Sequence, residues 1–188
     1  EIGYPIMAKA AAGGGGRGMR LIKEESEFDQ LFMAASSEAL AAFGDGTMYL
    51  ERFINNPRHI EVQVVGDSHG NAIHIGERDC SLQRRHQKVI EESPAILLND
   101  ETRAKLHDVA VKATKYLKYE GAGTFEFLAD DKQNIYFMEM NTRLQVEHPV
   151  SEMVSGIDIV ELMIKVAEGE KVPSQESIKF RGHAIECR

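Results

Sequence analysis

The sequence predicts an α+β fold in which a mainly antiparallel sheet packs against a few helices. Two observations indicate this class. Short apolar or alternating segments are joined by turn-forming residues, such as residues 66–71, which is typical of β-hairpins. Segments with helical spacing lie between these hairpins and do not follow each strand in turn, which argues against a doubly wound parallel sheet. With 188 residues, 43% of them hydrophobic, the chain can bury a substantial core.

The first part of the chain predicts a small domain over residues 1–53. Residues 6–10 and 19–22 are short apolar strands, and a glycine-rich loop between them interrupts regular structure. A further strand is expected over residues 48–53. The residues Asn55-Asn56-Pro57 then favour a hinge, so a second and larger domain is expected over the remainder, residues 54–188.

The second part begins with an alternating strand, in which Ile60, Val62 and Val64 point one way and the polar residues between them point the other. The other segments are read from turn residues and alternation. They are a return strand over 72–76, a basic irregular stretch over 77–88, a second hairpin with strands at 124–128 and 135–140, and a strand-like alternation from 182 to 188.

Three helices are expected from apolar residues spaced three and four apart. Ser26 is expected to open the first helix, with Asp29 as an approximate capping box. The expected limits are Ser26 and Gly44 for the first, Asn99 or Asp100 and Gly121 for the second, and Asp158 and Gly169 for the third.

Composition excludes several classes of function. The formal net charge of −8 argues against a general nucleic-acid-binding protein, which needs a basic face. No apolar run reaches the length that crosses a bilayer, so no membrane role is expected. Cys80 and Cys187 form no disulfide framework, which favours a reducing, cytoplasmic setting. The chain begins without Met and ends within a strand-like alternation, so we expect it to be a piece of a longer protein.

The glycine-rich loop, residues 13–18, indicates a phosphate-covering flap. Consecutive glycines expose backbone N–H groups and tolerate the positive φ angles that an anion-binding loop requires. Lys9, a charge at the end of an apolar strand just before the loop, supports this interpretation. A flexible hairpin tip without a ligand is the alternative.

The second predicted hairpin indicates a metal site. Its short loop would place Glu126 directly opposite Glu139, and Asn141 shares that face. Facing carboxylates repel each other unless a cation lies between them, and oxygen ligands of this kind suit Mg²⁺ or Mn²⁺. Two solvent-facing glutamates on an edge hairpin are the alternative.

Two further stretches indicate an anion site. Arg143, Gln145 and Glu147 alternate, so they point together if the segment is extended; an arginine can hold a planar oxyanion, and Glu147 could act as a base. A structural Arg143–Glu147 salt bridge is the alternative. The basic residues Arg84, Arg85, His86 and Lys88 cluster in an acidic chain, with a solvated loop as the alternative. Together these patterns predict a site for a metal–nucleotide and a small oxyanion.

At these residues the chain closely resembles biotin carboxylase, an ATP-grasp enzyme. The matching stretches are Lys9-Ala10 with GGGGRGMR, NPRHIE, ERDCSLQRRHQK, GTFEF and EMNTRLQVEHPV. The resemblance implies an ATP-grasp fold, with a lid subdomain over 1–53 and a central subdomain with the metal, bicarbonate and biotin sites over 54–188. It also implies a ligase that carboxylates carrier-bound biotin with ATP and bicarbonate through carboxyphosphate, the first half-reaction of acetyl-CoA carboxylase in fatty acid synthesis.

The resemblance implies a role for individual residues of this sequence. The expected contacts with ATP come from Lys9, Gly15, Gly16, Glu51, Arg52, Phe53, Ile54, His59 and His86. The expected ligands of Mg²⁺ or Mn²⁺, two ions in all, are Glu126, Glu139 and Asn141. The expected bicarbonate contacts are Lys88, Arg143, Gln145 and Val146. Glu147 is expected to deprotonate bicarbonate, Arg143 to orient the reacting groups, and Arg188 to stabilise the biotin enolate.

The resemblance also implies partners: a biotin carboxyl carrier protein or domain, a carboxyltransferase component, and a second copy in a homodimer. Arg52 stands where many members have lysine, and the family's preceding and following domains are not within this sequence. We therefore expect the piece to bind nucleotide weakly and not to turn over alone. The alternatives are the same module of a pyruvate or propionyl-CoA carboxylase, a ligase of the carbamoyl phosphate synthetase type, and a non-catalytic nucleotide-binding piece.

Overall fold

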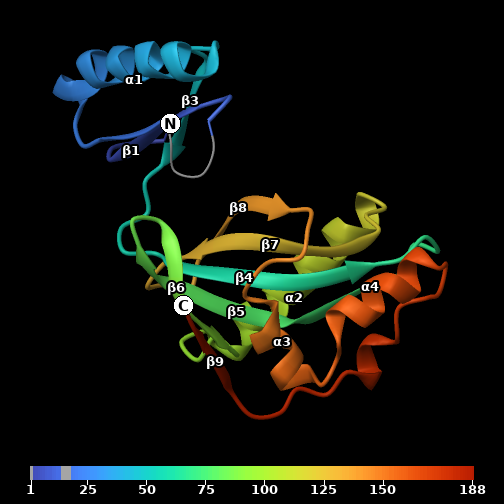
Figure 1. Cartoon of the computed structure of the whole chain (residues 1–188). Helices are drawn as coiled ribbons and strands as arrows, with labels where there is room; N and C mark the ends of the chain where they lie inside the picture. The colour runs from blue at the N-terminus through green and yellow to red at the C-terminus, as the bar shows by residue number, and fades with distance from the viewer. Residues whose placement is uncertain (1, 14–17) are drawn as a thin grey trace. The chain divides into compact units, whose positions relative to one another are not determined.

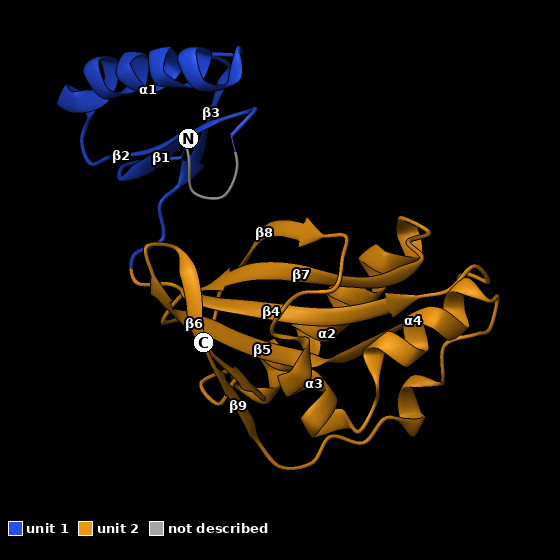
Figure 2. Cartoon of the chain, viewed as in Figure 1, with its two compact units in different colours: residues 1–55 blue, residues 56–188 orange. Residues whose placement is uncertain are grey.

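The structure is a computed structural model, and it describes residues 2–13 and 18–188. The chain divides into two compact units, residues 1–55 and 56–188 (Figure 2). The sequence predicted this boundary after residue 53, which is two residues before the boundary in the structure. None of the described helices is long and apolar enough to cross a membrane.

Unit 1, residues 1–55, is a three-stranded antiparallel sheet with one helix. The sheet has the order β2 (Met19–Ile22), β1 (Ile6–Ala10), β3 (Met48–Arg52), and the helix is α1 (Phe28–Phe43). The buried side chains of Ile6, Ala8 and Ile22 form its core, against which the apolar face of α1 packs. The expected strands are confirmed.

The start of the first helix differs from the prediction. A short 3₁₀ turn, η1 (Glu25–Glu27), precedes α1, and the Ser26 hydroxyl donates a hydrogen bond to Glu24 rather than capping the helix. Glu27 accepts a hydrogen bond from the backbone N–H of Lys23, so the local side chains stabilise the turn. The end of the helix is confirmed at Gly44, whose φ of 76° permits a left-handed C-cap.

Unit 2, residues 56–188, is built on a six-stranded sheet in which every pair of neighbouring strands is antiparallel, so the predicted fold class is confirmed. The strands, in spatial order, are β8 (Ile135–Asn141), β7 (Gly121–Ala129), β4 (Arg58–Gly66), β5 (Ala72–Arg84), β6 (Gln87–Ser93) and β9 (Ala184–Cys187). β9 confirms the strand expected near residue 185.

Both faces of the central strand β4 are covered, as Figure 1 shows. On one face Ile60, Val62 and Val64 pack with Leu106 and Ala110 of α2 (Asp100–Tyr116). On the other, α3 (His148–Ser155) and α4 (Ile159–Ala167) lie against the sheet. The polar residues that alternate with the isoleucine and valines are therefore buried under protein and do not face water.

The helices α2 and α4 (Ile159–Ala167) begin as the sequence predicts. The backbone N–H of Thr102 donates to the Asn99 side chain at the start of α2, and that of Glu161 donates to Asp158 at the start of α4. α3 was not predicted, because it is a single short helix of eight residues.

The stretch from 77 to 88 is not irregular as expected, and this prediction was wrong. It forms the second half of β5, a two-residue turn at Arg85 and His86 with positive φ angles, and the start of β6. The many charged residues of this stretch led to the prediction of an irregular segment. In the structure several of them are instead buried and form ion pairs inside the protein. Arg78 contacts Glu61, and Glu77 contacts both Arg103 and His107.

Candidate functional site

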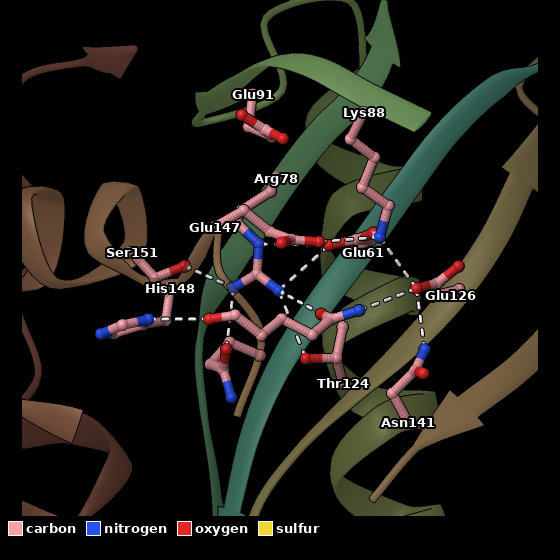
Figure 3. A network of polar contacts seen from close by, with 12 residues as sticks. Glu61, Arg78, Lys88, Glu91, Thr124, Glu126, Asn141, Glu147, His148 and Ser151 are labelled. Carbon is pink, nitrogen blue, oxygen red and sulfur yellow. Dashed lines mark hydrogen bonds and ion pairs between the residues drawn. The ribbon is translucent and has the colours of Figure 1, made fainter. Parts of the chain in front are cut away.

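The site is a cluster of buried charged groups on the α3 side of the sheet, which includes Lys88 of β6 and Arg78 of β5 (Figure 3). The Lys88 ammonium contacts three carboxylates. It lies 3.0 Å from Oε1 of Glu126 on β7 and 2.7 Å from Oε1 of Glu147 before α3, and it also contacts Glu61 on β4. All three glutamates are buried, so these ion pairs are shielded from solvent.

Arg78 of β5 lies at the buried side of the cluster. Its side chain is fully buried and donates hydrogen bonds to acceptors on four other segments. The acceptors are Glu61 Oε2 at 3.1 Å, Gln63 Oε1 at 2.8 Å, Thr124 Oγ1 at 3.3 Å, Gln145 Oε1 at 3.0 Å and Ser151 Oγ at 3.0 Å. A buried guanidinium is tolerated when its donors are satisfied, and here they tie the site's loop and α3 to the sheet.

Arg188 closes the side of the cluster next to β9. One guanidinium nitrogen lies 2.7 Å from Oε2 of Glu147 and 2.6 Å from Oε1 of Glu91 on β6. Both oxygens of Glu147 therefore contact a cation, Lys88 on one side and Arg188 on the other.

Glu126 is the most heavily contacted acceptor. Its Oε1 accepts hydrogen bonds from Asn141 at 2.8 Å and Gln145 at 2.9 Å besides the contact with Lys88, and its Oε2 lies 2.8 Å from Nε2 of His59. As predicted, Glu139 is its direct cross-strand partner.

Protonation balances the charges of the cluster. Burial disfavours the charged imidazole of His59, but hydrogen bonds with Glu126 and Glu61 and their charges outweigh it and raise the pKa of His59 to about 9. Burial opposes ionisation of Glu61 as well, yet the hydrogen bond from His59 and the charges of Arg78 and Lys88 lower its pKa well below the usual range. The same balance lowers the pKa of Glu126.

For Lys88, burial is outweighed by the charges of Glu61 and Glu126, and its pKa is raised. The cluster thus pairs four basic side chains with four acidic ones. The basic side chains are His59, Arg78, Lys88 and Arg188, and the acidic side chains are Glu61, Glu91, Glu126 and Glu147.

The structure brings together seven of the residues singled out in the sequence, which are His59, Lys88, Glu126, Asn141, Gln145, Glu147 and Arg188. Four others in unit 2 lie apart from the buried cluster. Glu139 is exposed on β8, His86 is exposed at the β5–β6 turn, and the side chains of Arg143 and Val146 are exposed.

Arg143, Gln145 and Glu147 were expected to point together if their segment is extended, and this condition is not met, because the segment is a loop and not a strand. Gln145 and Glu147 turn inward and are buried, whereas Arg143 stays exposed and contacts the Leu144 carbonyl and Asn141 Oδ1, each at 3.4 Å. No salt bridge joins Arg143 to Glu147 among the described residues.

The remaining predicted residues lie in unit 1. Lys9 on β1 and Glu51 on β3 form an ion pair with 2.5 Å between Nζ and Oε2. Arg52 ends β3, and the backbone N–H of Phe53, next to Ile54, donates to the Pro5 carbonyl. Gly15 and Gly16 lie outside the described residues.

Sequence reasoning missed Glu61, Arg78 and Glu91 as members of the cluster. The signal for Glu61 was available, because it interrupts an apolar strand as Glu126 does. Arg78 and Glu91 gave no comparable signal, since each lies among other charged residues in the sequence.

The donor chemistry of the site fits a hard divalent cation. Glu126, Glu139 and Asn141 offer carboxylate and amide oxygens from neighbouring positions of one hairpin. Lys88 and Arg188 place positive charge next to Glu147, and the amide nitrogen of Gln145 is a hydrogen-bond donor at Glu126. This combination can hold a small oxyanion next to a base.

Comparisons with known proteins agree with this chemistry. The family model described as "Carbamoyl-phosphate synthase L chain, ATP binding domain" matches residues 1–175. A biotin carboxylase of Nostoc sp. is 56% identical over 189 residues, which cover all of this chain and 42% of that protein. The chain spans between 26% and 42% of the length of the curated relatives that it matches.

Two solved structures are similar over the whole chain. One is a biotin carboxylase–β-γ-ATP complex from Campylobacter jejuni, with 70% identity, a TM-score of 0.94 and coverage of 42% of that chain. The other is the biotin carboxylase domain dimer of the Hydrogenobacter thermophilus 2-oxoglutarate carboxylase with MgADP, ADP and bicarbonate, with 55% identity, a TM-score of 0.92 and coverage of 42% of that chain. The resemblance and the fold expected from the sequence are thus confirmed: the chain has the ATP-grasp fold and belongs to the family of the carbamoyl-phosphate synthase L chain ATP-binding domain.

Proposed function

We propose that this chain carries the nucleotide, metal and bicarbonate sites of a biotin carboxylase, a ligase that carboxylates biotin with ATP and bicarbonate. The observation that carries the proposal is Glu147, a buried carboxylate held between Lys88 and Arg188. Relatives that are biotin carboxylases, and a similar domain solved with MgADP and bicarbonate, support it.

In this proposal Lys88, Arg188 and Gln145 bind the bicarbonate oxygens next to Glu147. Glu147 accepts the bicarbonate proton, and the resulting oxyanion attacks the γ-phosphate of ATP to give carboxyphosphate and ADP. Fixed positive charges in a buried site stabilise the charge that develops in such a step. Carboxyphosphate breaks down to CO₂ and phosphate, and the phosphate takes the proton of the ureido nitrogen of biotin. The resulting nitrogen adds to CO₂, while Arg188 stabilises the negative charge on the ureido oxygen.

Glu126, Glu139 and Asn141 would hold Mg²⁺ or Mn²⁺, two ions in all, which would neutralise charge on the nucleotide phosphates. The Asn141 amide N–H donates a hydrogen bond to Oε1 of Glu126. A half-turn of that amide exchanges its nitrogen and oxygen, so Asn141 can offer an oxygen in the same place.

The remaining predicted roles are part of the same proposal. In unit 1, Lys9, Gly15 and Gly16 would contact the ATP phosphates, and the residues around the end of β3, which are Glu51, Arg52, Phe53 and Ile54, would surround the adenine. In unit 2, His59 and His86 would contact the nucleotide, and Arg143 and Val146 would contact bicarbonate from the exposed side of the loop.

The partners we propose are a biotin carboxyl carrier protein or domain, a carboxyltransferase component and a second copy of the protein. A cytoplasmic location is part of the same proposal. The similar domain from Hydrogenobacter thermophilus was solved as a dimer. The acyl acceptor differs among the relatives, which include a methylcrotonoyl-CoA carboxylase subunit and a 2-oxoglutarate carboxylase subunit.

A second candidate function is a ligase in which carboxyphosphate reacts with ammonia. The description of the matching family model, a carbamoyl-phosphate synthase domain, supports this candidate. The test measures ADP formation by the intact protein that carries this chain, with Mg-ATP alone and after addition of bicarbonate, biotin or ammonia. ADP formation that requires bicarbonate and rises with biotin is expected. A rate that ignores biotin and rises with ammonia would identify the second candidate, and no bicarbonate dependence would overturn both.

A further inference from the structure

Glu91 is a buried carboxylate for which the proposed reaction has no use. Its side chain is fully buried on β6, opposite Glu186 of β9. Its Oε1 forms an ion pair with the Arg188 guanidinium at 2.6 Å, but neither Oε1 nor Oε2 accepts a hydrogen bond from the described residues. Of the ion pairs among residues 2–13 and 18–188, the one with Arg188 joins Glu91 to the cluster.

The position is costly for an acid. Burial raises the pKa of Glu91, and the nearby charges of Glu186 and Glu147 act in the same direction, while Arg188 opposes them. An apolar side chain of similar volume usually stabilises a buried position as well as or better than an ion pair does. A contribution to fold stability therefore does not explain why a glutamate occupies this position.

The geometry at Arg188 suggests what Glu91 does. A single guanidinium nitrogen lies between Oε1 of Glu91 and Oε2 of Glu147, 2.6 Å from one and 2.7 Å from the other. The Arg188 backbone N–H is fixed to the Val89 carbonyl at 2.9 Å. The Arg188 main chain is thus held next to β6. The direction of its side chain is set by two carboxylates that both attract the same guanidinium nitrogen.

Arginine and a single carboxylate prefer a two-bond, fork-to-fork pair. Lys88 already contacts Oε1 of Glu147, and Glu91 competes for the guanidinium as a second acceptor, so both contacts oppose a two-bond Arg188–Glu147 pair. A two-bond pair would cover the oxygen atoms that Glu147 needs to receive a proton, and it would occupy the donors that Arg188 needs for a substrate.

We propose that Glu91 is a positioning residue that holds Arg188 between two carboxylates and so prevents it from closing onto Glu147. The inference rests on the proposed function, because it assigns Arg188 and Glu147 to the reaction. Glu91 itself touches neither substrate nor metal. It acts through Arg188.

The test is a double-substitution cycle in the intact protein that carries this chain. Bicarbonate- and biotin-dependent ADP formation is measured for the unchanged protein, for Glu91→Gln, for Arg188→Lys and for the two together. Glu91→Gln keeps the shape of the side chain and removes its charge, and it is expected to lower kcat about tenfold with the KM for ATP unchanged. In the Arg188→Lys background the same change is expected to have no further effect.

The matched control is Glu92→Gln, the same substitution at the next residue of β6. Glu92 pairs with His183 at 3.3 Å and lies outside the cluster, so kcat should stay the same. Equal losses from Glu91→Gln in both backgrounds, or no loss in either, would overturn the positioning role.

A crystal structure of the intact Glu91→Gln protein separates this inference from the proposed function. Arg188 is expected to leave its midway position and to form two hydrogen bonds with Glu147. An unchanged Arg188 would overturn the inference whatever the activity. Absence of bicarbonate-dependent ADP formation in the unchanged protein would overturn the proposed function, and the position of Arg188 in the variant would still decide the structural claim.

Discussion

The Oε1 atom of Gln145 accepts a hydrogen bond from the guanidinium of Arg78 across 3.0 Å. A guanidinium only donates, so this bond fixes the orientation of the Gln145 amide. The amide nitrogen must then point the other way, where it donates to Glu126 at 2.9 Å. Arg78, which is fully buried, thereby determines that Gln145 offers the site a donor and not an acceptor.

Replacement of Arg78 by Met should destabilise the protein by about 3–5 kcal/mol, because it removes a buried cation that pairs with the buried Glu61 carboxylate. The midpoint of urea unfolding, followed by circular dichroism, measures the effect. The control is Arg84→Met on the same strand, whose exposed side chain should contribute less than about 0.5 kcal/mol. Equal effects at the two arginines would contradict the role given to Arg78.

Glu147→Gln should reduce bicarbonate-dependent ADP formation at least about 100-fold, because an amide cannot take up the bicarbonate proton. Nucleotide binding should stay nearly unchanged, as measured by titration calorimetry with ADP. Glu168→Gln, an exposed position at the end of α4, is the control and should retain full activity. Loss of nucleotide binding in Glu147→Gln would assign Glu147 a structural role.

Glu139→Gln should weaken Mn²⁺ binding in the presence of nucleotide roughly tenfold or more, because it removes one of the proposed carboxylate ligands. Electron paramagnetic resonance titration reports free Mn²⁺ directly. Asp131→Asn, which removes an exposed carboxylate in the turn of the same hairpin, is the matched control. If both variants bind Mn²⁺ equally well, Glu139 is not a ligand.

The pH dependence of stability should contain a contribution from His74, which stacks on His107 with 3.9 Å between ring centroids. Burial, followed by the charge of His107, lowers the pKa of His74 to about 4, and Glu77 opposes this shift. Between pH 4 and 6.5 the unfolded state therefore binds more protons at this residue, so stability falls as the pH falls through that window.

The loss should be on the order of 2 kcal/mol after partial exposure is taken into account. His74→Phe keeps a ring in the stack and should remove this part of the pH dependence, measured as the urea midpoint at a series of pH values. A His74→Phe profile as steep as that of the unchanged protein would refute the assignment.

Gly66→Ala should destabilise the protein by about 3 kcal/mol, because a Cβ at this end of β4 would lie 2.0 Å from the Tyr119 carbonyl oxygen. Gly70→Ala, in the adjoining turn, meets no atom within 4 Å and carries only the penalty of its φ of 84°, about 1 kcal/mol. Thermal unfolding of the two variants should rank them in this order, and the reverse order would refute the steric argument.

The sequence allowed much of the fold to be predicted wherever the rules are local. Asn99, Asp158 and Gly44 mark helix ends because each satisfies backbone groups within three or four residues of itself. The pairing of Glu126 with Glu139 followed from alternation and a short turn, and the structure confirms it. Such signals act over a few residues, so a single sequence contains them.

The centre of the site could be predicted less well, because its contacts join residues far apart in the sequence. Arg78 meets Glu61 across 17 positions and Ser151 across 73. Arg143 was placed with Gln145 and Glu147 by assuming an extended segment, and tertiary packing of α3 replaced that geometry by a turn. No local sequence pattern predicts which charged residues the folded chain will bury next to one another.

The alternation of β4, with apolar residues toward α2 and charged residues toward Lys88, also selects the register of the sheet. A slip of one residue would move every side chain of β4 to the opposite face. Glu61 would then lie among the apolar residues that pack against α2, without Arg78 or Lys88 to balance its charge, and Ile60 would replace it among the acids and bases. The groups proposed for chemistry therefore also destabilise misaligned sheets, because a chain that folds with the wrong strand alignment buries charges without partners.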